Sequence, residues 1–393
     1  MPSQLAHLFF AADALGSALP RGAFHTVTAY KGALGLGAQG PDIFLHNRRS
    51  KPSGLRYGAR LHRAGYGTVL AEAAAAAAAA GADPLGETAA YLYAFATHAA
   101  LDRYLHPYIN YRAGRRERGR PETALLGPMH AYLERLIDTA LLSARLGVAP
   151  CDARFHAYFD VGSQLPQPIA SALAVAFEAE IPSARRDGLL YERIANGYRD
   201  ARSYYAWAHR DLPAARRAAA LSAGTLADRM RRLAILHPEA VPLGLDVLNL
   251  RRRVWRDPCP SGRKRRTESV PQLYAEALDH AVPVVRALFS LLNRGSEAYA
   301  NTAAEPNHPT GTPLRPGSTA PSALRVRTLV GDSDLSDHYN RPSRCSKHYS
   351  NPLPLYRILE RQLLEILETA ELTQRGQPSE RSAGRATTPH ERS

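Results

Sequence analysis

Residues 97–108 read Thr-His-Ala-Ala-Leu-Asp-Arg-Tyr-Leu-His-Pro-Tyr and place His98, Asp102 and His106 at intervals of four residues. Side chains four residues apart lie on one face of an α-helix, about 5–6 Å from each other. Apolar residues precede this stretch, so we predict a helix over 86–106. Because Pro107 disfavours helical geometry at the residue before it, we expect His106 to turn away from the helical line.

Residues 130–138 repeat this arrangement in the next predicted helix. They read His-Ala-Tyr-Leu-Glu-Arg-Leu-Ile-Asp, with His130, Glu134 and Asp138 at the same spacing. Both motifs place ionisable groups in apolar sequence that should be buried, and a buried charge must be paired or bind a metal ion. The spacing alone supports two interpretations about equally: metal ligands, or hydrogen-bonded pairs that brace a helical bundle.

Helical periodicity continues through residues 1–295, where strand-forming runs are sparse, and this pattern predicts an all-α fold. The alanine tract at 71–80 predicts a helix of small residues that its neighbours approach closely. The predicted helices cover residues 3–15, 67–80, 86–106, 122–146, 167–179, 188–208, 213–235 and 270–293.

The composition also divides the chain into parts. Residues 1–295 should form one helical domain, and residues 296–352, rich in Pro, Ser and Thr, a largely disordered linker. An amphipathic helix at 353–373 should dock on the helical domain or on a partner. Residues 374–393 are polar, and we expect them to be a disordered tail.

Further histidine and carboxylate side chains precede the two motifs. His7 lies in an apolar N-terminal helix, Asp42 follows a Gly-Pro turn, and His46 and His62 come next. Imidazoles and carboxylates without a thiolate suit zinc in an open, catalytic site. Simpler explanations exist for three of them: a core histidine for His7, a turn former or helix N-cap for Asp42, and plain surface for His46.

The charge of the chain is unevenly distributed. The 393 residues include 50 Lys and Arg against 36 Asp and Glu, a formal net charge of +14, and 45% are hydrophobic. Such a composition excludes a wholly disordered or fibrous chain, and its basic balance favours an anionic partner. Residues 111–120 hold five arginines against one glutamate, and residues 251–266 hold eight basic residues against one aspartate. The excess therefore predicts local basic rims that meet an anionic lipid surface or a phosphate substrate.

Cysteine usage and hydropathy bear on the compartment. Cys151, Cys259 and Cys345 are too few and too scattered for a disulfide framework or a thiolate zinc site. The sequence shows no signal-peptide pattern and no apolar run of about 18 residues. We therefore expect a cytoplasmic protein, with peripheral contact to an anionic membrane as an option.

The combined pattern resembles the zinc-dependent phospholipase C family of bacteria. The resemblance covers roughly residues 1–290 and is carried mainly by the two histidine–carboxylate motifs, with weaker matches at 2–7, 36–42, 61–62 and 248–258. It implies the all-α, phospholipase C-like bundle that secreted phospholipases C share with zinc nucleases acting on single-stranded nucleic acid. It also implies two or three zinc ions held by side chains and by a main-chain amine.

The ligands that the resemblance implies are His7, Asp42, His62, His98, Asp102, His106, His130 and Glu134. Asp42, His98 and Asp102 would serve one pair of ions, with His62 preferred to His46 as the additional imidazole. His106, His130 and Glu134 would hold another ion, and His7 would sit with the third. Met1, or Pro2 after its removal, would supply the amine, and Asp138 would orient a ligand histidine.

The expected function is a zinc-dependent phosphodiester hydrolase, phospholipase C-like, in which Asp42 is the candidate general base. Its partner would be a phospholipid or another phosphodiester substrate, with no stable nucleic-acid complex; the oligomeric state stays open. The alternatives are a single-strand nuclease or other phosphoesterase of the same fold, and a catalytically inactive helical binding protein. Tyrosines at 104, 108, 111, 204 and 205 could stack bases or enclose a choline group.

Overall fold

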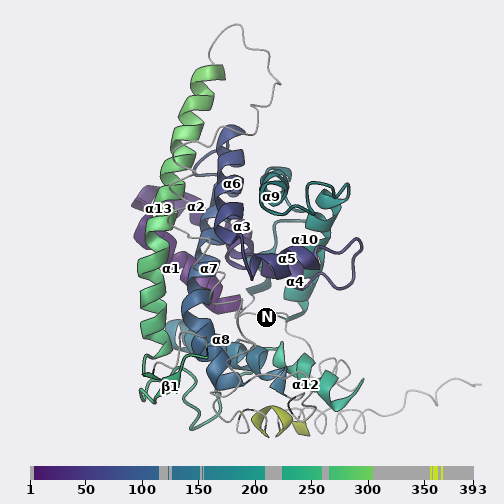
Figure 1. Cartoon of the computed structure of the whole chain (residues 1–393). Helices are drawn as coiled ribbons and strands as arrows, with labels where there is room; N and C mark the ends of the chain where they lie inside the picture. The colour runs from purple at the N-terminus through teal and green to yellow at the C-terminus, as the bar shows by residue number, and fades with distance from the viewer. Residues whose placement is uncertain are drawn as a thin grey trace, which may run out of the picture.

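The computed structural model describes residues 4–114, 123, 126–150, 153, 155–208, 224–258, 265–303, 355, 357–361 and 364–365, with side chains as far as 296 in the last helix of the domain. Within these residues nearly all regular structure is helical, which confirms the predicted all-α fold (Figure 1). The helices are α1 (Gln4–Ala18), α2 (Arg21–Thr28), α3 (Lys31–Ala38), α4 (Asp42–Leu45), α5 (Leu55–Leu61), α6 (Tyr66–Ala79), α7 (Glu87–Ala113), α8 (Met129–Leu146), the 3₁₀ turn η2 (Phe155–Phe159), α9 (Gln167–Glu180), α10 (Leu190–Ala208), α12 (Leu226–Ala234) and α13 (Val270–Ala303).

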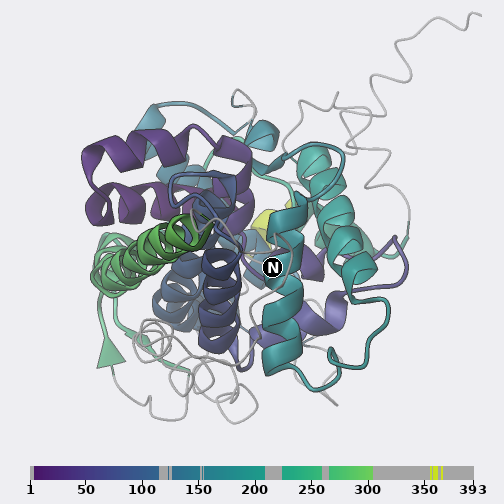
Figure 2. The same cartoon turned by 90° about the horizontal axis from the view of Figure 1, so that it is seen from above.

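Helix α7 is the central element of the domain. It packs against α1, α3, α6, α8 and α13, and most of its 27 residues are buried. Figure 2, viewed from above, places α1, α2 and α13 on one side of the α6 and α7 pair and α9 and α10 on the other. A helix covered on several sides is apolar around most of its circumference, so the polar side chains that it does bury are exceptional.

Pro107 does not divert the chain as expected. Helix α7 continues through this proline and ends only at Gly114, whose φ of +71° suits a residue without Cβ. Proline removes one backbone hydrogen bond, but the surrounding packing holds the helix on both sides of it. The prediction that His106 leaves the helical line was therefore wrong. Its ring instead folds back, with Nδ1 3.1 Å from the carbonyl oxygen of Asp102.

Helices α2 to α5 lie in a segment where the sequence predicted no helix. They are short, and α3 carries glycines because it packs directly on other backbone. A Cβ at Gly35 would lie 1.8 Å from the carbonyl oxygen of Tyr158, and one at Gly37 would lie 2.2 Å from that of Tyr91. Glycine lowers helix propensity by about 1 kcal/mol, so only these tertiary contacts stabilise the helix.

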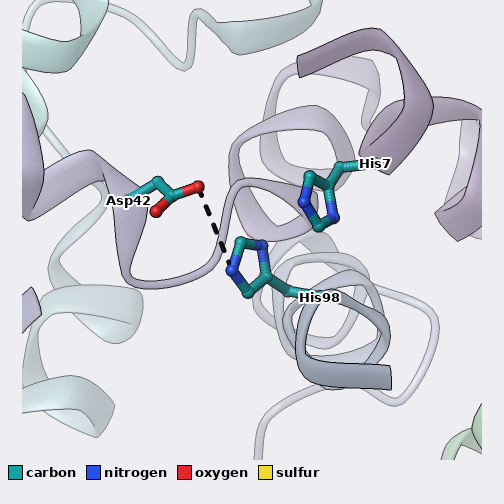
Figure 3. A group of neighbouring side chains, drawn as sticks. All are labelled: His7, Asp42 and His98. Carbon is teal, nitrogen blue, oxygen red and sulfur yellow. Dashed lines mark ion pairs between the residues drawn. The ribbon is translucent and has the colours of Figure 1, made fainter. Parts of the chain in front are cut away.

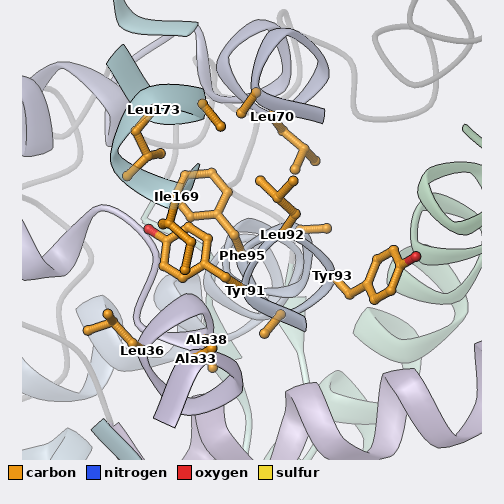
Figure 4. Close-up of a cluster of buried hydrophobic side chains, with 14 of the residues drawn as sticks. Ala33, Leu36, Ala38, Leu70, Tyr91, Leu92, Tyr93, Phe95, Ile169 and Leu173 are labelled. Carbon is orange, nitrogen blue, oxygen red and sulfur yellow. The ribbon is translucent and has the colours of Figure 1, made fainter. Parts of the chain in front are cut away.

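The alanine tract forms α6, as predicted. It packs between α9 and α13, and its small side chains allow close approach, since Ala78 would be 2.5 Å from a Cβ at Gly295. The buried faces of α6, α7 and α9 meet in one apolar cluster, part of which Figure 4 shows, with Leu70, Leu92 and Leu173 among its members.

A second apolar cluster lies around the C-terminal half of α7, with α8, α12 and α13. The two-residue strands β1 (Trp255–Arg256) and β2 (Arg265–Arg266) pair antiparallel at its edge, and Trp255 is buried in it. The second cluster also includes Leu355 and Leu359, which are 3% and 0% exposed and belong to helical residues of the predicted 353–373 segment. That segment therefore docks on the domain through these two leucines.

Several predicted boundaries can be compared with the structure. Helix α13 extends to Ala303, past the predicted domain end at 295. Helix α8 begins at Met129, within the predicted helix 122–146, and α12 begins at Leu226, within the predicted helix 213–235, after a capping box at Thr225. The rest of the predicted linker from 304 and the tail at 374–393 lie outside the described residues. Among the helices of the described residues, none combines the length and the apolar character needed to cross a membrane.

Candidate metal centre

Asp42 reaches the interior from the first residue of α4. The turn before it needs Gly40, which has a φ of +54° and whose Cβ would come within 2.6 Å of the His98 ring. Asp42 itself is 0% exposed, and within the described residues neither carboxylate oxygen makes a well-directed hydrogen bond. Its side chain is therefore neither an N-cap nor a turn former, and the simpler explanation for this residue is excluded.

The orientation of His98 is fixed by backbone on the other side of the same turn. Its Nδ1 lies 3.1 Å from the carbonyl oxygen of Ala38, so Nδ1 carries the proton and donates. Its Nε2 then faces the carboxylates, 3.3 Å from Asp102 Oδ2 and 3.9 Å from Asp42 Oδ2. Burial opposes protonation, but Asp102 and Asp42 raise the pKa of this imidazole, so a metal ion bound at Nε2 would displace a proton there.

His7 lies against His98, as Figure 3 shows. The two rings stack with centroids 4.2 Å apart, and His7 Nε2 is 3.2 Å from Asp102 Oδ1. His7, Asp42 and His98 each offer a ligand atom within 4.8 Å of the others. The resemblance placed His7 with a third ion beside the chain terminus, whereas the structure brings it into contact with the ligands of the first pair. Residues 1–3, which include both candidate amines, lie outside the described residues.

His62 and His46, the two alternatives for the additional imidazole, have different environments. His62 Nε2 is 2.8 Å from Asp42 Oδ1, its Nδ1 is 2.7 Å from the carbonyl oxygen of Gly58, and its ring joins a second group with His98 and Asp102. His46 stacks on Tyr204 at 4.1 Å, and burial lowers its pKa to about 3. The geometry therefore favours His62.

A third group of candidate ligands combines α7 and α8, the helices that carry the two histidine–carboxylate motifs. His130 Nε2 is 2.8 Å from Glu134 Oε1 along α8, and His106 Nε2 reaches the same oxygen from α7 at 3.4 Å. The rings of His106 and His130 are stacked 5.2 Å apart. All three offer ligand atoms within 4.8 Å of one another, so this trio is a second possible metal position.

Asp102 connects the two positions. Its Oδ1 lies 3.2 Å from both His7 Nε2 and His106 Nδ1, and its Oδ2 faces His98. One carboxylate thus touches histidines of every group, and the eight predicted ligands form one continuous cluster from α1, α4, α7, α8 and the end of α5. A cluster of this kind can hold neighbouring metal ions.

The ion-free electrostatics keep the carboxylates charged. Burial alone would raise the pKa of Asp102, but His106 and His98 hold it well below its ordinary value. Burial opposes ionisation of Glu134 too, and His130 and His106 outweigh it, so its pKa is also lowered. His106 shows the reciprocal effect: despite burial, Asp102 and Glu134 raise its pKa to about 10. The carboxylates are therefore ionised beside protonated imidazole, and bound metal ions could balance the same negative charge in place of those protons.

The cluster fits a metal ion better than it fits internal pairing. Within the described residues, Nδ1 of His7 and Oδ2 of Asp42 are buried and lack a hydrogen bond, while Asp42 Oδ1 and His98 Nε2 have only histidine–carboxylate contacts, at 2.8 and 3.3 Å. Buried polar atoms are otherwise almost always satisfied, and each unsatisfied one costs about 1–3 kcal/mol. Imidazole and carboxylate donors without a thiolate are ligands for zinc and similar ions. Bracing pairs would leave Nδ1 of His7 and Oδ2 of Asp42 unexplained.

Asp138 belongs to a neighbouring network. Its carboxylate accepts hydrogen bonds from the backbone N–H groups of Gln4 at 3.0 Å and Ala6 at 2.8 Å, and from Arg135 at 3.2 Å. Nε2 of His237 lies 2.8 Å away. These contacts differ from the predicted one to a ligand histidine; they fix the first turn of α1, the helix that carries His7. Arg135 lies three residues before Asp138 on α8, whereas His237 comes from 99 residues away, so helical spacing could point to the first partner but not to the second.

Of the five tyrosines predicted as aromatic platforms, two are buried and three, Tyr104, Tyr111 and Tyr204, are half-buried. Tyr108 and Tyr205 are 1% and 0% exposed, and Tyr108 donates to the carbonyl oxygen of Val247. Tyr204 is half-buried against His46. A stack of exposed bases or an open choline cage cannot be built from Tyr108 and Tyr205.

Comparison with protein-family models, with curated proteins and with solved structures found no match to this chain. The family resemblance of the motifs thus stays a prediction. The candidate function has to be argued from the side chains that α7, α8 and the Gly40 turn bring together.

Proposed function

We propose that the chain is a zinc-dependent phosphodiester hydrolase, with a phospholipid as the substrate class. The observation that carries the proposal is the convergence of five histidines and three carboxylates in one buried cluster, with three sets of ligand atoms inside 4.8 Å. Asp102 alone faces three imidazoles, more than a single bracing pair would require. Multinuclear zinc sites use such shared ligands to act on phosphate esters.

Zinc ions bound here would supply Lewis acidity, polarising a phosphoryl oxygen and lowering the pKa of a bound water. The chain's own residues then have separate roles. His98, oriented by the Ala38 carbonyl group, would hold an ion of the first pair with His62 and Asp102, and His7 and Asp42 offer the adjoining ligand atoms. His106, His130 and Glu134 would hold the second position.

Asp42 is the proposed general base. Its Oδ1 and Oδ2 face His62 and His98 and make no well-directed hydrogen bond within the described residues, so one oxygen can accept a proton from an attacking water. The Gly40 turn holds this carboxylate in the interior, where a preorganised acceptor needs little rearrangement.

The phospholipid is preferred to single-stranded nucleic acid because of the aromatic side chains. Sequence-independent binding of single strands relies on exposed rings on which bases stack. Tyr108 and Tyr205 are buried in the core, and Tyr104, Tyr111 and Tyr204 are half-buried, so none of the five is an exposed ring. This favours a substrate recognised through its phosphate, and nuclease activity is the alternative that the assay measures alongside.

The test combines metal content with turnover. Purified full-length protein should contain at least one zinc per chain and should hydrolyse a chromogenic phosphorylcholine diester faster than single-stranded DNA. The Glu134→Gln variant should lose the second position and His98→Ala the first. Zinc below one equivalent would remove the basis of the proposal, while zinc with nuclease turnover alone would transfer it to the nuclease class.

His46→Gln is the matched control. His46 is a buried histidine close in sequence to Asp42, but its ring stacks on Tyr204 and belongs to none of the ligand groups. This variant should keep the full zinc content and turnover, whereas His62→Gln should lose activity. The opposite ranking would show that the additional imidazole had been assigned to the wrong residue.

A further inference from the structure

The loop at 246–256 has a backbone that is unusual for its sequence. Asn249 and Arg252 both adopt positive φ values, +53° and +54°, which cost free energy for residues other than glycine. Two side chains hold this shape. The Asp246 carboxylate accepts hydrogen bonds from the N–H groups of Leu250 and Arg251, at 2.8 and 2.9 Å.

Asn249 fastens the loop to the residues that follow β2. Its amide donates to the carbonyl oxygens of Arg253, Thr267 and Glu268 at 3.1–3.3 Å, and its own oxygen accepts from the Arg253 N–H group at 3.1 Å. Asn249 is 4% exposed, so these bonds are shielded from water. The strained loop is therefore rigid, and what it displays is held in place.

The side chains that this loop displays are apolar and cationic. Leu250 is 62% exposed and Val254 44%. The arginines around them are exposed too, and in the described part of the chain none of them forms an ion pair: Arg251, Arg252, Arg253, Arg256 and Arg265. We call these seven residues the arginine–leucine platform. Exposed aliphatic groups bordered by unpaired cations are complementary to a surface with anionic groups above an apolar layer.

The platform is joined firmly to the domain. Trp255 lies between the arginines in sequence but points inward; it is 1% exposed, and its indole N–H donates to the carbonyl oxygen of Glu268. Its ring meets Tyr108 edge-on at 5.6 Å, and Tyr108 lies two residues after His106 on α7. Figure 1 shows β1 at the end of the molecule where α8 lies. The platform is thus connected through Trp255 and Tyr108 to α7, the helix that carries His98, Asp102 and His106.

We propose that the arginine–leucine platform docks the protein on an anionic phospholipid surface, with Leu250 and Val254 entering the headgroup region and the arginines contacting lipid phosphates. Anionic leaflets attract clustered basic residues, and partly buried aliphatic side chains add to that attraction. A single-stranded nucleic acid fits less well, because the one large aromatic ring of the loop, Trp255, is buried and cannot stack bases. Docking does not depend on bound zinc.

The experiment is sedimentation of the full-length protein with vesicles, in the presence of a zinc chelator so that binding is measured without turnover. Phosphatidylserine–phosphatidylcholine vesicles should bind the protein, and pure phosphatidylcholine vesicles should bind it much more weakly. Each basic residue strengthens binding to an anionic leaflet roughly fivefold, so replacing Arg251, Arg253 and Arg256 with glutamine should weaken it roughly a hundredfold. Leu250→Asp should weaken it at least roughly tenfold.

Matched controls carry the same changes elsewhere. Leu189→Asp alters another exposed leucine, and the combined glutamine replacement of Arg21, Arg186 and Arg199 removes the same charge from other exposed positions. Both should bind vesicles like the wild type. Circular dichroism melting of each variant identifies loss of fold. If Leu250→Asp fails to fold, the arginine variant, which is altered only at exposed side chains, tests the proposal.

Three results would overturn the proposal. These are equal binding to neutral and anionic vesicles, platform variants that bind as well as their controls, and tighter binding of a single-stranded oligonucleotide than of anionic vesicles. Loss of zinc or of diesterase activity would not affect the outcome, because binding is measured with the metal chelated. Failure of docking can therefore be distinguished from failure of the proposed catalytic function.

Discussion

Replacing Asp138 with asparagine should destabilise the protein far more than breaking an exposed ion pair. The Asp138 carboxylate is 0% exposed and accepts from two N–H groups of α1 and from Arg135, whose side chain is also 0% exposed. Removing one partner of a buried pair costs about 3–5 kcal/mol, because the other charge stays buried without it. We therefore expect the free energy of unfolding to fall by about 3–5 kcal/mol.

The control is Asp13→Asn. Asp13 pairs with Arg145 where both side chains are about one-third exposed, at 33% and 35%. Exposed pairs contribute about 0.2–1 kcal/mol, so the two expected ranges do not overlap. Urea unfolding with zinc chelated measures the free energy of unfolding of both variants, and an unchanged slope of the free energy with urea confirms that the change is one of stability. A loss of less than about 1 kcal/mol in Asp138→Asn would refute the assignment of this network.

Three further changes test other parts of the structure. Gly40→Ala should lower zinc affinity, because the φ angle of Gly40 is +54° and the new Cβ would meet the His98 ring. Calorimetric titration measures this affinity, and an affinity equal to that of the wild type would contradict the prediction. Leu359→Ala should lower the free energy of unfolding by about 2–5 kcal/mol, since this side chain is fully buried, and a neutral result would mean that the C-terminal helix does not dock. Asp200 accepts hydrogen bonds from Ser50 and from the loop around it, and although burial opposes ionisation, these bonds lower the pKa of Asp200. Its contribution to the free energy of unfolding is therefore present above the unfolded pKa of about 3.9 and is lost as the pH falls through the folded pKa. The stability difference between wild type and Asp200→Asn should therefore shrink on acidification below about pH 4, and a difference that grew would show the opposite shift.

The sequence predicted the local part of the fold and of the site well, because helical periodicity is a short-range property. The spacing of His98 and Asp102 on one helix brings Nε2 and Oδ2 to 3.3 Å, as expected for residues four apart. The same holds for His130 and Glu134 on α8. Pro107 was misjudged because its local preference was overcome by packing around α7.

The contacts between helices were beyond prediction from spacing. The stack of His7 on His98 and the approach of His106 to Glu134 depend on how α1, α7 and α8 cross. The short helices α2 to α5 were missed for a related reason, since glycines such as Gly35 and Gly37 oppose helix formation locally and serve close packing. The Gly-Pro turn before Asp42 indicated a projecting carboxylate, but the need for glycine at position 40 depends on the His98 ring that packs against it from α7.

The most direct measurement is anomalous diffraction at the zinc absorption edge from crystals of the full-length protein grown without chelator. Our interpretation predicts a peak among His62, His98 and Asp102 or the adjoining His7 and Asp42, and another among the second trio, His106, His130 and Glu134. Crystals that diffract with ordered density for these side chains and yet show no anomalous peak at either position would contradict it.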